Sequence, residues 1–389
     1  MAIKSISEIN VNHKRVFVRA DLNVPVENRK INSTARIDAT IPTIEYLLKE
    51  GAQVMLTSHL GRPEEGIYDE DLSLKPIADY LRTKLNISVR LIDDWVNSRF
   101  EIKQNELLVL ENTRFNKGEK KCDETLSRYY ADLADVFVMD AFGTAHRKEA
   151  STYGIGKYIK EKCAGFLFYD EVKALSKTFD NPEKPMLAIV GGSKVSTKLS
   201  VLKNLAHKVD GLVLGGGILN TFIASMGNNV GASLYEPDLI SEAKKIISFL
   251  EERGSKLPVI IDVVCAKEFS GSAKSELKLL DEVEDDDMIL DIGPQSIINV
   301  VEKINEAKTI LWNGPVGVFE IEQFSNGTKA LAESIANSTG FSLAGGGDTI
   351  ASIEKFGIQN KVSYISTAGG AFLEFAEGKK LPAIEMLES

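Results

Sequence analysis

Short runs of β-branched and aliphatic residues alternate along this chain with longer segments whose apolar residues recur at helical spacing. This alternation is typical of a parallel β-sheet whose strands are joined by helices that pack on its faces. One expected helix carries Ile37, Ile41, Ile44 and Leu48 on a single face. We expect strands at residues 16–19, 53–57, 107–110 and 136–139 in the first half, and at 186–190, 211–214, 258–264, 288–291, 309–312, 341–344 and 362–365 in the second.

The length of 389 residues exceeds what one hydrophobic core usually serves, so two domains of roughly 150 to 200 residues are expected. Pro182 and Pro185 interrupt the chain near its middle and place the connection between the domains around residues 160–185. No apolar run approaches the ~18 residues that a membrane helix needs. Residues 1–14 also lack the apolar core of a signal peptide.

The cysteines and the net charge exclude several classes of protein. Cys122, Cys163 and Cys265 show no paired spacing, which argues against a disulfide framework and against a cysteine-based metal site. A cytoplasmic protein is the expectation. A net charge of -10 argues against binding to nucleic acid or to an anionic membrane, because both require excess positive surface. Any anionic ligand must therefore meet a local cationic patch.

The two halves of the chain differ in chemistry. Eleven of the twelve arginines lie in the first 150 residues, whereas twenty-five of the thirty glycines lie after residue 150. Arginine offers a permanently charged fork that matches carboxylate and phosphate groups, and glycine lets a backbone approach a phosphate closely. This division predicts a small-anion site in the first half and a nucleotide site in the second.

Cationic side chains follow the strands of the first half, where open α/β sheets bind their ligands. Residues 19–25 read R-A-D-L-N-V-P, residues 58–63 S-H-L-G-R-P, residues 111–115 E-N-T-R-F and residues 140–147 D-A-F-G-T-A-H-R. These segments deliver Arg19, Arg62, Arg114 and Arg147 with His59 and His146, while Arg36 opens the first helix. Each arginine alone could be a surface ion pair, but several together favour a phosphorylated carboxylic acid. Asp21 and Asn23 could bind a hydroxyl or form a turn before Pro25.

Glycine follows the strands of the second half, but neither the GxxxxGK[ST] phosphate loop nor the GxGxxG dinucleotide motif is present. Lys194 and Lys198 are four residues apart, which would put both amines on one helical face beside an anion, or leave both solvated. Asp348 could hold magnesium or cap a helix, and Glu320 could bind a ribose or open a helix. The acidic residues 281–287 lack the spacing of a calcium loop, which favours a solvated loop.

Seven segments of the chain resemble, in the same order, the motifs of the phosphoglycerate kinase family: R-x-D-x-N-V-P, S-H-L-G-R-P, E-N-x-R-F, D-A-F-G-T-A-H-R, G-G-S-K-V-S-x-K, N-G-P-V-G-V-F-E and G-G-G-D-T. The resemblance covers nearly the whole length. It implies two Rossmann-like α/β domains with parallel sheets flanked by helices, joined by a hinge helix. The N-terminal domain would span residues 1–165 and the C-terminal domain 166–368, with 163–177 as the connecting helix and 369–389 returning to the N-terminal domain.

The same resemblance assigns residues to each ligand. The residues implied to bind 3-phosphoglycerate are Asp21, Leu22, Asn23, Arg36, His59, Leu60, Gly61, Arg62, Arg114 and Arg147. Those implied to bind ATP or ADP are Lys198, Asn313, Glu320, Gly346, Gly347, Asp348 and Thr349, with Mg²⁺ on Asp348. Arg36, Lys194, Gly346 and Gly369 would act in catalysis, and Arg19 would have a structural place.

The implied reaction is reversible, Mg²⁺-dependent phosphoryl transfer between 1,3-bisphosphoglycerate and ADP, by a monomer whose domains close around both substrates. A carboxylate acceptor needs no general base, which is consistent with the lack of a convincing His–Asp or Cys–His pair.

One departure from the family pattern matters: Ala368 stands where the family commonly has glycine. A two-domain NAD(P) oxidoreductase and a non-catalytic phosphosugar-binding protein are the alternatives. An oxidoreductase would need the GxGxxG motif, which this chain lacks. A phosphosugar-binding role would leave Lys194, Lys198 and Asp348 unexplained.

Overall fold

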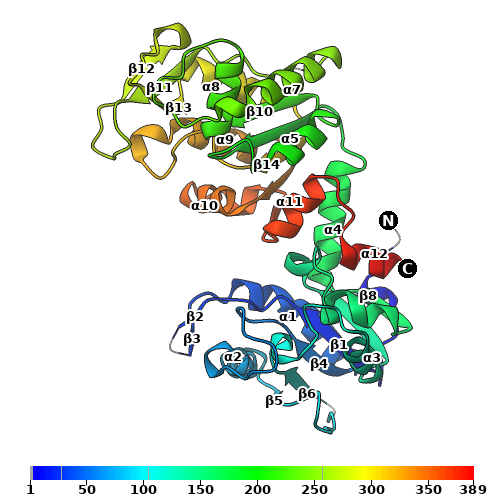
Figure 1. The fold of residues 1–389 in the computed structure, drawn as a ribbon. Coiled ribbons are helices and arrows are strands. Elements are labelled where there is room, and N and C mark those ends of the chain that lie inside the picture. The colour runs from blue at the N-terminus through cyan, green and yellow to red at the C-terminus, as the bar shows by residue number, and fades with distance from the viewer. Residues whose placement is uncertain (1–2, 28, 104, 256) are drawn as a thin grey trace. The chain divides into compact units, whose positions relative to one another are not determined.

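The computed structural model describes residues 3–27, 29–103, 105–255 and 257–389. The chain divides into two compact units (Figure 1). Unit 1 comprises Met1–Lys173 and Lys380–Ser389, and unit 2 comprises Ala174–Lys379. Among the described residues, no helix combines the length and the apolar character needed to cross a bilayer.

Unit 1 is built on a six-stranded parallel sheet, as the alternation of strand and helix patterns predicts. The sheet confirms all four strands expected in the first half. It also contains two that were not expected, β5 and β8. Its order is β5 (Ser88–Ile92), β6 (Glu106–Leu110), β4 (Gln53–Thr57), β1 (Arg15–Ala20), β7 (Val136–Asp140) and β8 (Glu161–Ala164).

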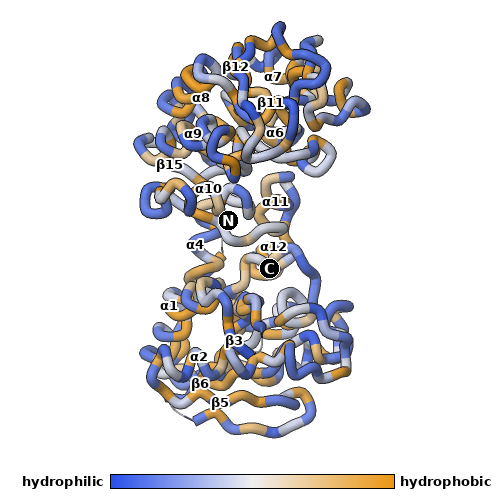
Figure 2. Tube along the Cα trace, turned by 90° about the vertical axis from the view of Figure 1, so that its left-hand side faces the viewer, coloured by the Kyte–Doolittle hydropathy of each residue, from blue (hydrophilic) through white to orange (hydrophobic). Residues whose placement is uncertain are grey.

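The strands inside this sheet, between the edge strands β5 and β8, consist mainly of apolar residues that are buried. Every residue of β6 and β7 is buried, which is typical of a parallel sheet covered on both faces. Figure 2 shows β6 as one of the hydrophobic stretches of the tube. The helices of unit 1 are α1 (Ala35–Lys49), α2 (Lys75–Leu85), α3 (Glu124–Asp132) and α12 (Pro382–Glu388), and a short hairpin pairs β2 (Val26–Glu27) with β3 (Lys30–Ile31).

Helix α1 forms where the apolar spacing predicts it. Ile37, Ile41 and Ile44 are buried in the core of unit 1, and Leu48 packs against that core while partly exposed. The helix ends just before Gly51, whose φ of 79° lies in the left-handed region that glycine adopts without strain. This end brings the chain directly into β4.

Unit 2 contains a five-stranded parallel sheet that confirms five further predicted strands. Its order is β10 (Gly211–Gly215), β9 (Met186–Gly191), β14 (Thr309–Asn313), β15 (Phe341–Gly345) and β16 (Tyr364–Ser366). The helices are α5 (Leu199–Ala206), α6 (Gly216–Ser225), α7 (Ile240–Glu252), α8 (Pro294–Glu306), α9 (Asn326–Asn337), α10 (Gly347–Lys355) and α11 (Gly370–Ala376).

A separate antiparallel sheet holds the strands predicted at 258–264 and 288–291. Its order is β12 (Glu276–Leu279), β11 (Asp262–Ala266) and β13 (Met288–Ile292). The expectation that these two segments join the parallel sheet is therefore wrong. Hydrophobic runs indicate strands, but they do not say which neighbour a strand pairs with.

The segment that connects the units is helix α4 (Phe166–Phe179), and the boundary between Lys173 and Ala174 falls inside it. The helix was expected to begin at residue 163, but residues 161–164 form strand β8. The unit boundaries thus differ from the expected 165/166 and 368/369. The last ten residues belong to unit 1, where the backbone N–H of Ala383 donates to the carbonyl of Ala145 at 3.0 Å.

Candidate active site

Four neighbouring strands of unit 1 end in the segments that carry the predicted anion-binding residues. The strands β6, β4, β1 and β7 lie in that order and are parallel, so the loops that follow them emerge at the same edge of the sheet. Arg114, His59, Asp21 and Arg147 each lie on one of these loops. The fold therefore brings together side chains that are up to 126 residues apart in sequence.

Arg114 is the most enclosed of the expected anion-binding arginines, with 6% of its surface exposed. One guanidinium nitrogen, Nη1, donates to the carbonyl of Gly61 at 2.7 Å, and Nη2 pairs with the buried carboxylate of Glu149 at 3.1 Å. Its Nε–H is buried without a partner among the described residues. Burying an unpaired donor costs about 1 to 3 kcal/mol, so the arrangement favours an additional acceptor.

Arg147 shows the same shortage of acceptors. It is half-buried, its Nε donates to His146 at 3.4 Å, and its Nη1 has no partner among the described residues. Burial lowers the pKa of Arg147, and the positive charges of Arg114 and Arg62 lower it further against the opposing carboxylates of Glu149 and Asp21.

Arg36 lies in the first turn of α1 and points its guanidinium at the loop after β1. Its Nη1 donates to Asp21 Oδ2 at 3.2 Å and to the carbonyl of Asn23 at 3.0 Å, while 40% of the side chain is exposed. The Asn23 side chain accepts from the backbone N–H of Gly61 at 2.9 Å. Asn23 thus links the loops after β1 and β4, and Asp21 and Asn23 together hold Arg36 at a partly open position.

The other residues expected to bind the anion include two buried leucines, an exposed arginine and a glycine in a tight turn. Leu22 and Leu60 are buried in the core of unit 1, and the backbone N–H of Leu60 donates to Asn112 Oδ1 at 3.2 Å. Arg62 is exposed and has no hydrogen-bond or ion-pair partner among the described residues. Gly61 has φ of 59°, and a Cβ there would lie 2.5 Å from a methyl group of Leu72. Glycine is therefore required at this turn.

His59 lies beneath the arginines, with only 3% of its surface exposed. Burial first, and then the charges of Arg19, Arg114, Arg147 and Arg36, lower its pKa far below the usual range. Its Nδ1 lies 3.2 Å from Nη2 of Arg19. Arg19 is fully buried, which agrees with the structural place that the family resemblance implied.

Unit 2 contains a cavity of about 700 Å³ that the glycine-rich segments line. Glu320 and Asp348, both expected from the sequence, lie on its wall. Both are exposed, and neither carboxylate has a hydrogen-bond or ion-pair partner among the described residues. Lining residues that the expected set omits include Gly216, Gly217, Leu290, Pro315, Val316 and Phe269. Pro315 and Val316 belong to the N-G-P-V-G-V-F-E motif, and Gly216 and Gly217 belong to a run of glycines at the end of β10. Nothing in the sequence pattern marks Leu290 or Phe269.

Lys198 is held at the edge of the sheet by backbone carbonyls. Its Nζ donates to Gly191 O at 2.5 Å and to Asn313 O at 2.9 Å. Burial lowers its pKa from 10.5 to about 8, although the nearby Asp348 opposes this shift. Lys194 is exposed in the loop before α5. The expected placement of both lysines on one helical face is wrong, because the helix begins only at Leu199.

Asn313, at the end of β14, contacts the end of β15. Its side-chain Nδ2 donates to Gly345 O at 2.6 Å, and its Oδ1 is buried without a partner among the described residues. The hydroxyl of Thr349, in the first turn of α10, accepts from the backbone N–H of Gly314 at 2.7 Å. Gly346 precedes this helix with φ of 100°, and a Cβ there would lie 2.8 Å from Asn313 Nδ2.

The loop around Gly369 explains how alanine is tolerated at position 368. The left-handed residue of this loop is Gly369, with φ of 51°, and Ala368 is not among the positive-φ residues. Ala368 is buried, and its N–H donates to Ser366 Oγ at 3.3 Å. A Cβ on Gly369 or on Gly347 would meet no atom within 4 Å, so both glycines leave open space beside the backbone.

Other glycines of unit 2 serve a different purpose. A Cβ on Gly191 would lie 1.8 Å from the carbonyl oxygen of Pro315, and one on Gly314 would lie 2.3 Å from the carbonyl of Gly191. The loops after β9 and β14 therefore pack backbone against backbone. Glycine at these positions follows from that close approach and does not by itself indicate a phosphate.

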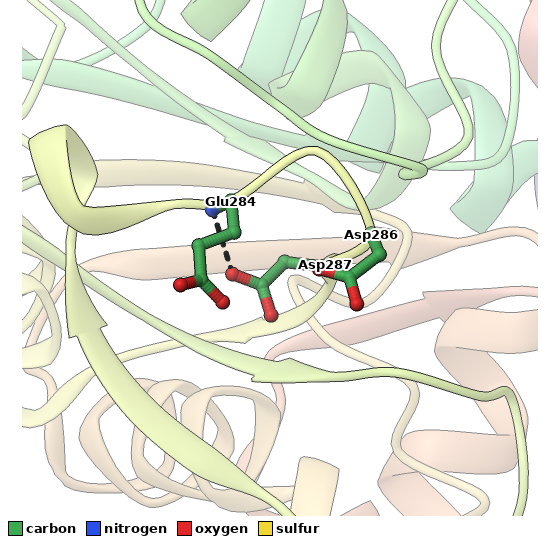
Figure 3. Close-up of side chains that lie close together, drawn as sticks. All are labelled: Glu284, Asp286 and Asp287. Atoms are coloured by element: carbon green, nitrogen blue, oxygen red, sulfur yellow. Dashed lines mark hydrogen bonds between the residues drawn. The ribbon is translucent and has the colours of Figure 1, made fainter.

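The acidic segment 281–287 forms an ion-pair network. Figure 3 shows Glu284, Asp286 and Asp287 close together, with the N–H of Glu284 donating to Asp287. The ammonium of Lys267 lies within 3.0 Å of all three carboxylates, and that of Lys278 lies 2.7 Å from Asp287. These two cations satisfy the carboxylates, so the cluster carries no metal assignment.

Comparison with known proteins identifies the family. Residues 6–379 match the family model described as phosphoglycerate kinase. The chain belongs to the phosphoglycerate kinase family. It is 57% identical, over 100% of its own length and 99% of the relative's, to the phosphoglycerate kinase of Vibrio campbellii.

Solved structures of phosphoglycerate kinases share the fold of both units. The enzyme from Coxiella burnetii has a TM-score of 0.97 at 48% identity, with 99% of each chain covered. That from Pyrococcus horikoshii OT3 has a TM-score of 0.78 at 31% identity, covering 99% of this chain and 98% of the other. The chain is thus a glycolytic kinase, a phosphotransferase with a carboxyl group as acceptor, and the predicted α/β fold is confirmed.

Proposed function

We propose that the arginine cluster of unit 1 binds 3-phosphoglycerate or 1,3-bisphosphoglycerate. The observation that carries this assignment is the pair of buried guanidinium N–H groups, on Arg114 Nε and Arg147 Nη1, that lack acceptors among the described residues. An anion with several oxygens would satisfy them and relieve the repulsion between neighbouring cations. Arg62, exposed beside them, adds charge at the rim. Asp21 and Asn23 are placed to accept from or donate to the substrate hydroxyl.

The nucleotide, ATP or ADP, occupies the cavity of unit 2. Its volume of about 700 Å³ lies in the range of cofactor pockets. Glu320, which has no partner within the described part of the chain, is an acceptor suited to a ribose hydroxyl, and Lys198 supplies positive charge for the phosphates. The N-terminal turn of α10, at Gly347 and Thr349, offers backbone N–H groups to the same anion.

Asp348 is the residue of this cavity that suits Mg²⁺. Its carboxylate is exposed, unpartnered among the described residues and on the cavity wall, and Mg²⁺ is commonly bound by one or two carboxylates together with substrate phosphates. When bound, the ion would neutralise phosphate charge. The chain's own contribution is the position of Asp348 at a helix start, close enough to Lys198 to affect its pKa.

Transfer needs positioning and charge neutralisation, with no general base, because the acceptor carboxylate is already ionised at neutral pH. Arg36 from unit 1 and Lys194 from unit 2 are partly or fully exposed cations available to the transferring phosphoryl group. The backbones of Gly346 and Gly369 complete its surroundings. Since the two substrate sites belong to different units, in-line transfer requires closure of the units around both ligands.

We also propose a cytoplasmic monomer. All three cysteines are free thiols, which suits a reducing compartment.

The decisive experiment couples ADP formation from ATP and 3-phosphoglycerate to a spectrophotometric readout, with and without magnesium. Activity that requires both substrates and the metal is the expected result. Arg147→Ala should abolish calorimetric binding of 3-phosphoglycerate. The matched control is Arg99→Ala, which removes an exposed unit 1 arginine outside the cluster and should change nothing. Equal losses in both variants would refute the assignment of the anion site.

A further inference from the structure

The contact between Arg19 and His59 determines where the histidine proton lies. Nη2 of Arg19 is 3.2 Å from Nδ1 of His59, and both side chains are buried. A guanidinium has donors and no acceptor, so Nδ1 must accept and cannot carry a proton. The neutral ring then carries its proton on Nε2.

Arg19 cannot turn away from this contact, because its other donors are also engaged. Its Nε donates to Ser151 Oγ at 2.9 Å, and its Nη1 donates to the carbonyl of Ala20. The hydroxyl of Ser151 in turn donates to Glu119 Oε1 at 2.5 Å. Arg19, Ser151 and Glu119 are all fully buried. The chain of hydrogen bonds fixes the guanidinium plane, and through it the orientation of the His59 ring.

No hydrogen bond to His59 Nε2 occurs among the described residues, although the rest of the ring is enclosed. The charged groups with the largest effect on the ring are cationic: Arg19 from β1, Arg36 from α1, Arg114 after β6 and Arg147 after β7. The carboxylates of this region have other partners: Asp21 pairs with Arg36, Glu149 pairs with Arg114, and Glu119 accepts from Ser151 beside Arg19. A second proton on this ring would face these four positive charges, and no described carboxylate pairs with the ring. The ring therefore has one donor, Nε2–H, and none of the described residues accepts from it.

We propose that Arg19 is a positioning residue that locks His59 into the neutral Nε2–H tautomer, so that His59 donates a hydrogen bond to the anionic substrate and takes no proton from it. This inference rests on the proposed substrate site in unit 1. It assigns His59 a binding role that is independent of pH between 5 and 8. It also gives a role to Arg19, an arginine without exposed surface.

Nitrogen-15 NMR of the imidazoles in the ligand-free wild-type protein tests the tautomer directly. The chain has four histidines, so the His59 signals can be assigned by their loss in His59→Gln. We expect a lone-pair nitrogen at Nδ1, a protonated Nε2, and no change of either signal from pH 5 to 8. A protonated Nδ1, or a signal that titrates in this range, would overturn the proposal.

The positioning role needs a variant that keeps the charge of Arg19 but not its fork. Arg19→Lys should allow both His59 tautomers to appear, because an ammonium cannot hold Ser151, Ala20 and His59 together. If the variant does not fold, Ser151→Ala removes one of the three anchors and should produce the same mixture in part. A pure Nε2–H tautomer in every folded variant would contradict the role of Arg19.

Calorimetry with 3-phosphoglycerate tests the donor itself. His59→Asn can still accept from Arg19 but is too short to reach the Nε2 position, whereas the amide of His59→Gln reaches it. His59→Asn should weaken binding about 10- to 100-fold, as expected for a lost hydrogen bond to a charged group, and His59→Gln clearly less. Equal losses would contradict the donor role. If the wild-type protein bound no 3-phosphoglycerate, the proposed function would fail, while the NMR result would stand.

Discussion

Raising the pH from 7 to 9 should weaken nucleotide binding about tenfold through one side chain. Burial lowers the pKa of Lys198 to about 8 in the ligand-free protein. About nine-tenths of the molecules then carry the ammonium form at pH 7, and about one-tenth at pH 9. Phosphate oxygens favour the charged form, so binding raises this pKa and takes up a proton above pH 8. Affinity therefore falls as the pH rises through 8.

The same ionisation acts on stability with the opposite sign. Because the folded-state pKa lies below the ordinary 10.5 of the unfolded chain, the unfolded state binds more protons between pH 8 and 10.5. This group's contribution to stability therefore increases over that window. Below pH 8, burying the charge costs about 3 kcal/mol in the ligand-free protein.

Isothermal titration of ADP at fixed excess magnesium, at several pH values from 7 to 9, measures the effect. Lys198→Arg is the matched control, since a guanidinium stays charged throughout this range; its affinity should be lower but independent of pH. If wild-type affinity were flat, or if both proteins lost affinity equally, Lys198 would not be the titrating group at the phosphates.

Three further variants separate the roles of individual cations. Arg36→Ala should lower kcat about 100-fold or more while changing both KM values little, because a contact to the moving phosphoryl group acts mainly in the transition state; a rise in KM alone would contradict this. Arg62→Ala should weaken 3-phosphoglycerate and leave MgATP unaffected in calorimetry, and equal losses would refute separate sites. Lys194→Ala should slow the single-turnover rate at saturating substrates with little loss of nucleotide affinity, and a profile identical to that of Lys198→Ala would remove the distinction.

Periodicity in the sequence predicts the buried parallel strands but not the marginal ones. All four residues of the predicted strand at 136–139 are apolar and buried, and the prediction is confirmed. Strand β5 places a charged residue, Arg90, in its centre, and β8 begins with Glu161 and Lys162. Neither has a local pattern that distinguishes it from a loop. Both form because the sheet edge offers them backbone partners, which is tertiary information.

The candidate site was predictable to the extent that residue type determines its chemistry. Several arginines at successive strand ends indicate an anion site even when their exact contacts are unknown. The fold brings these strand ends together at one edge of the unit 1 sheet. The geometry around Lys194 was not predictable, because a four-residue spacing implies one face only inside a helix, and α5 begins after both lysines. Helix α5 follows the segment in which Lys198 donates to the carbonyls of Gly191 and Asn313.

The glycines show why sequence alone could not separate ligand contacts from packing. Gly191 is the last residue of β9 and Gly369 follows β16 by three residues, so the two look similar in sequence. A Cβ on Gly191 would nevertheless strike Pro315, whereas one on Gly369 would meet open space. Only Gly369 leaves its backbone accessible to a ligand. A Gly191→Ala change would therefore act through the fold, whereas Gly369→Ala would act through backbone strain at φ of 51°, beside the proposed position of the transferring phosphoryl group. The same residue type, at the same kind of position, thus serves two functions that only the neighbouring backbone distinguishes.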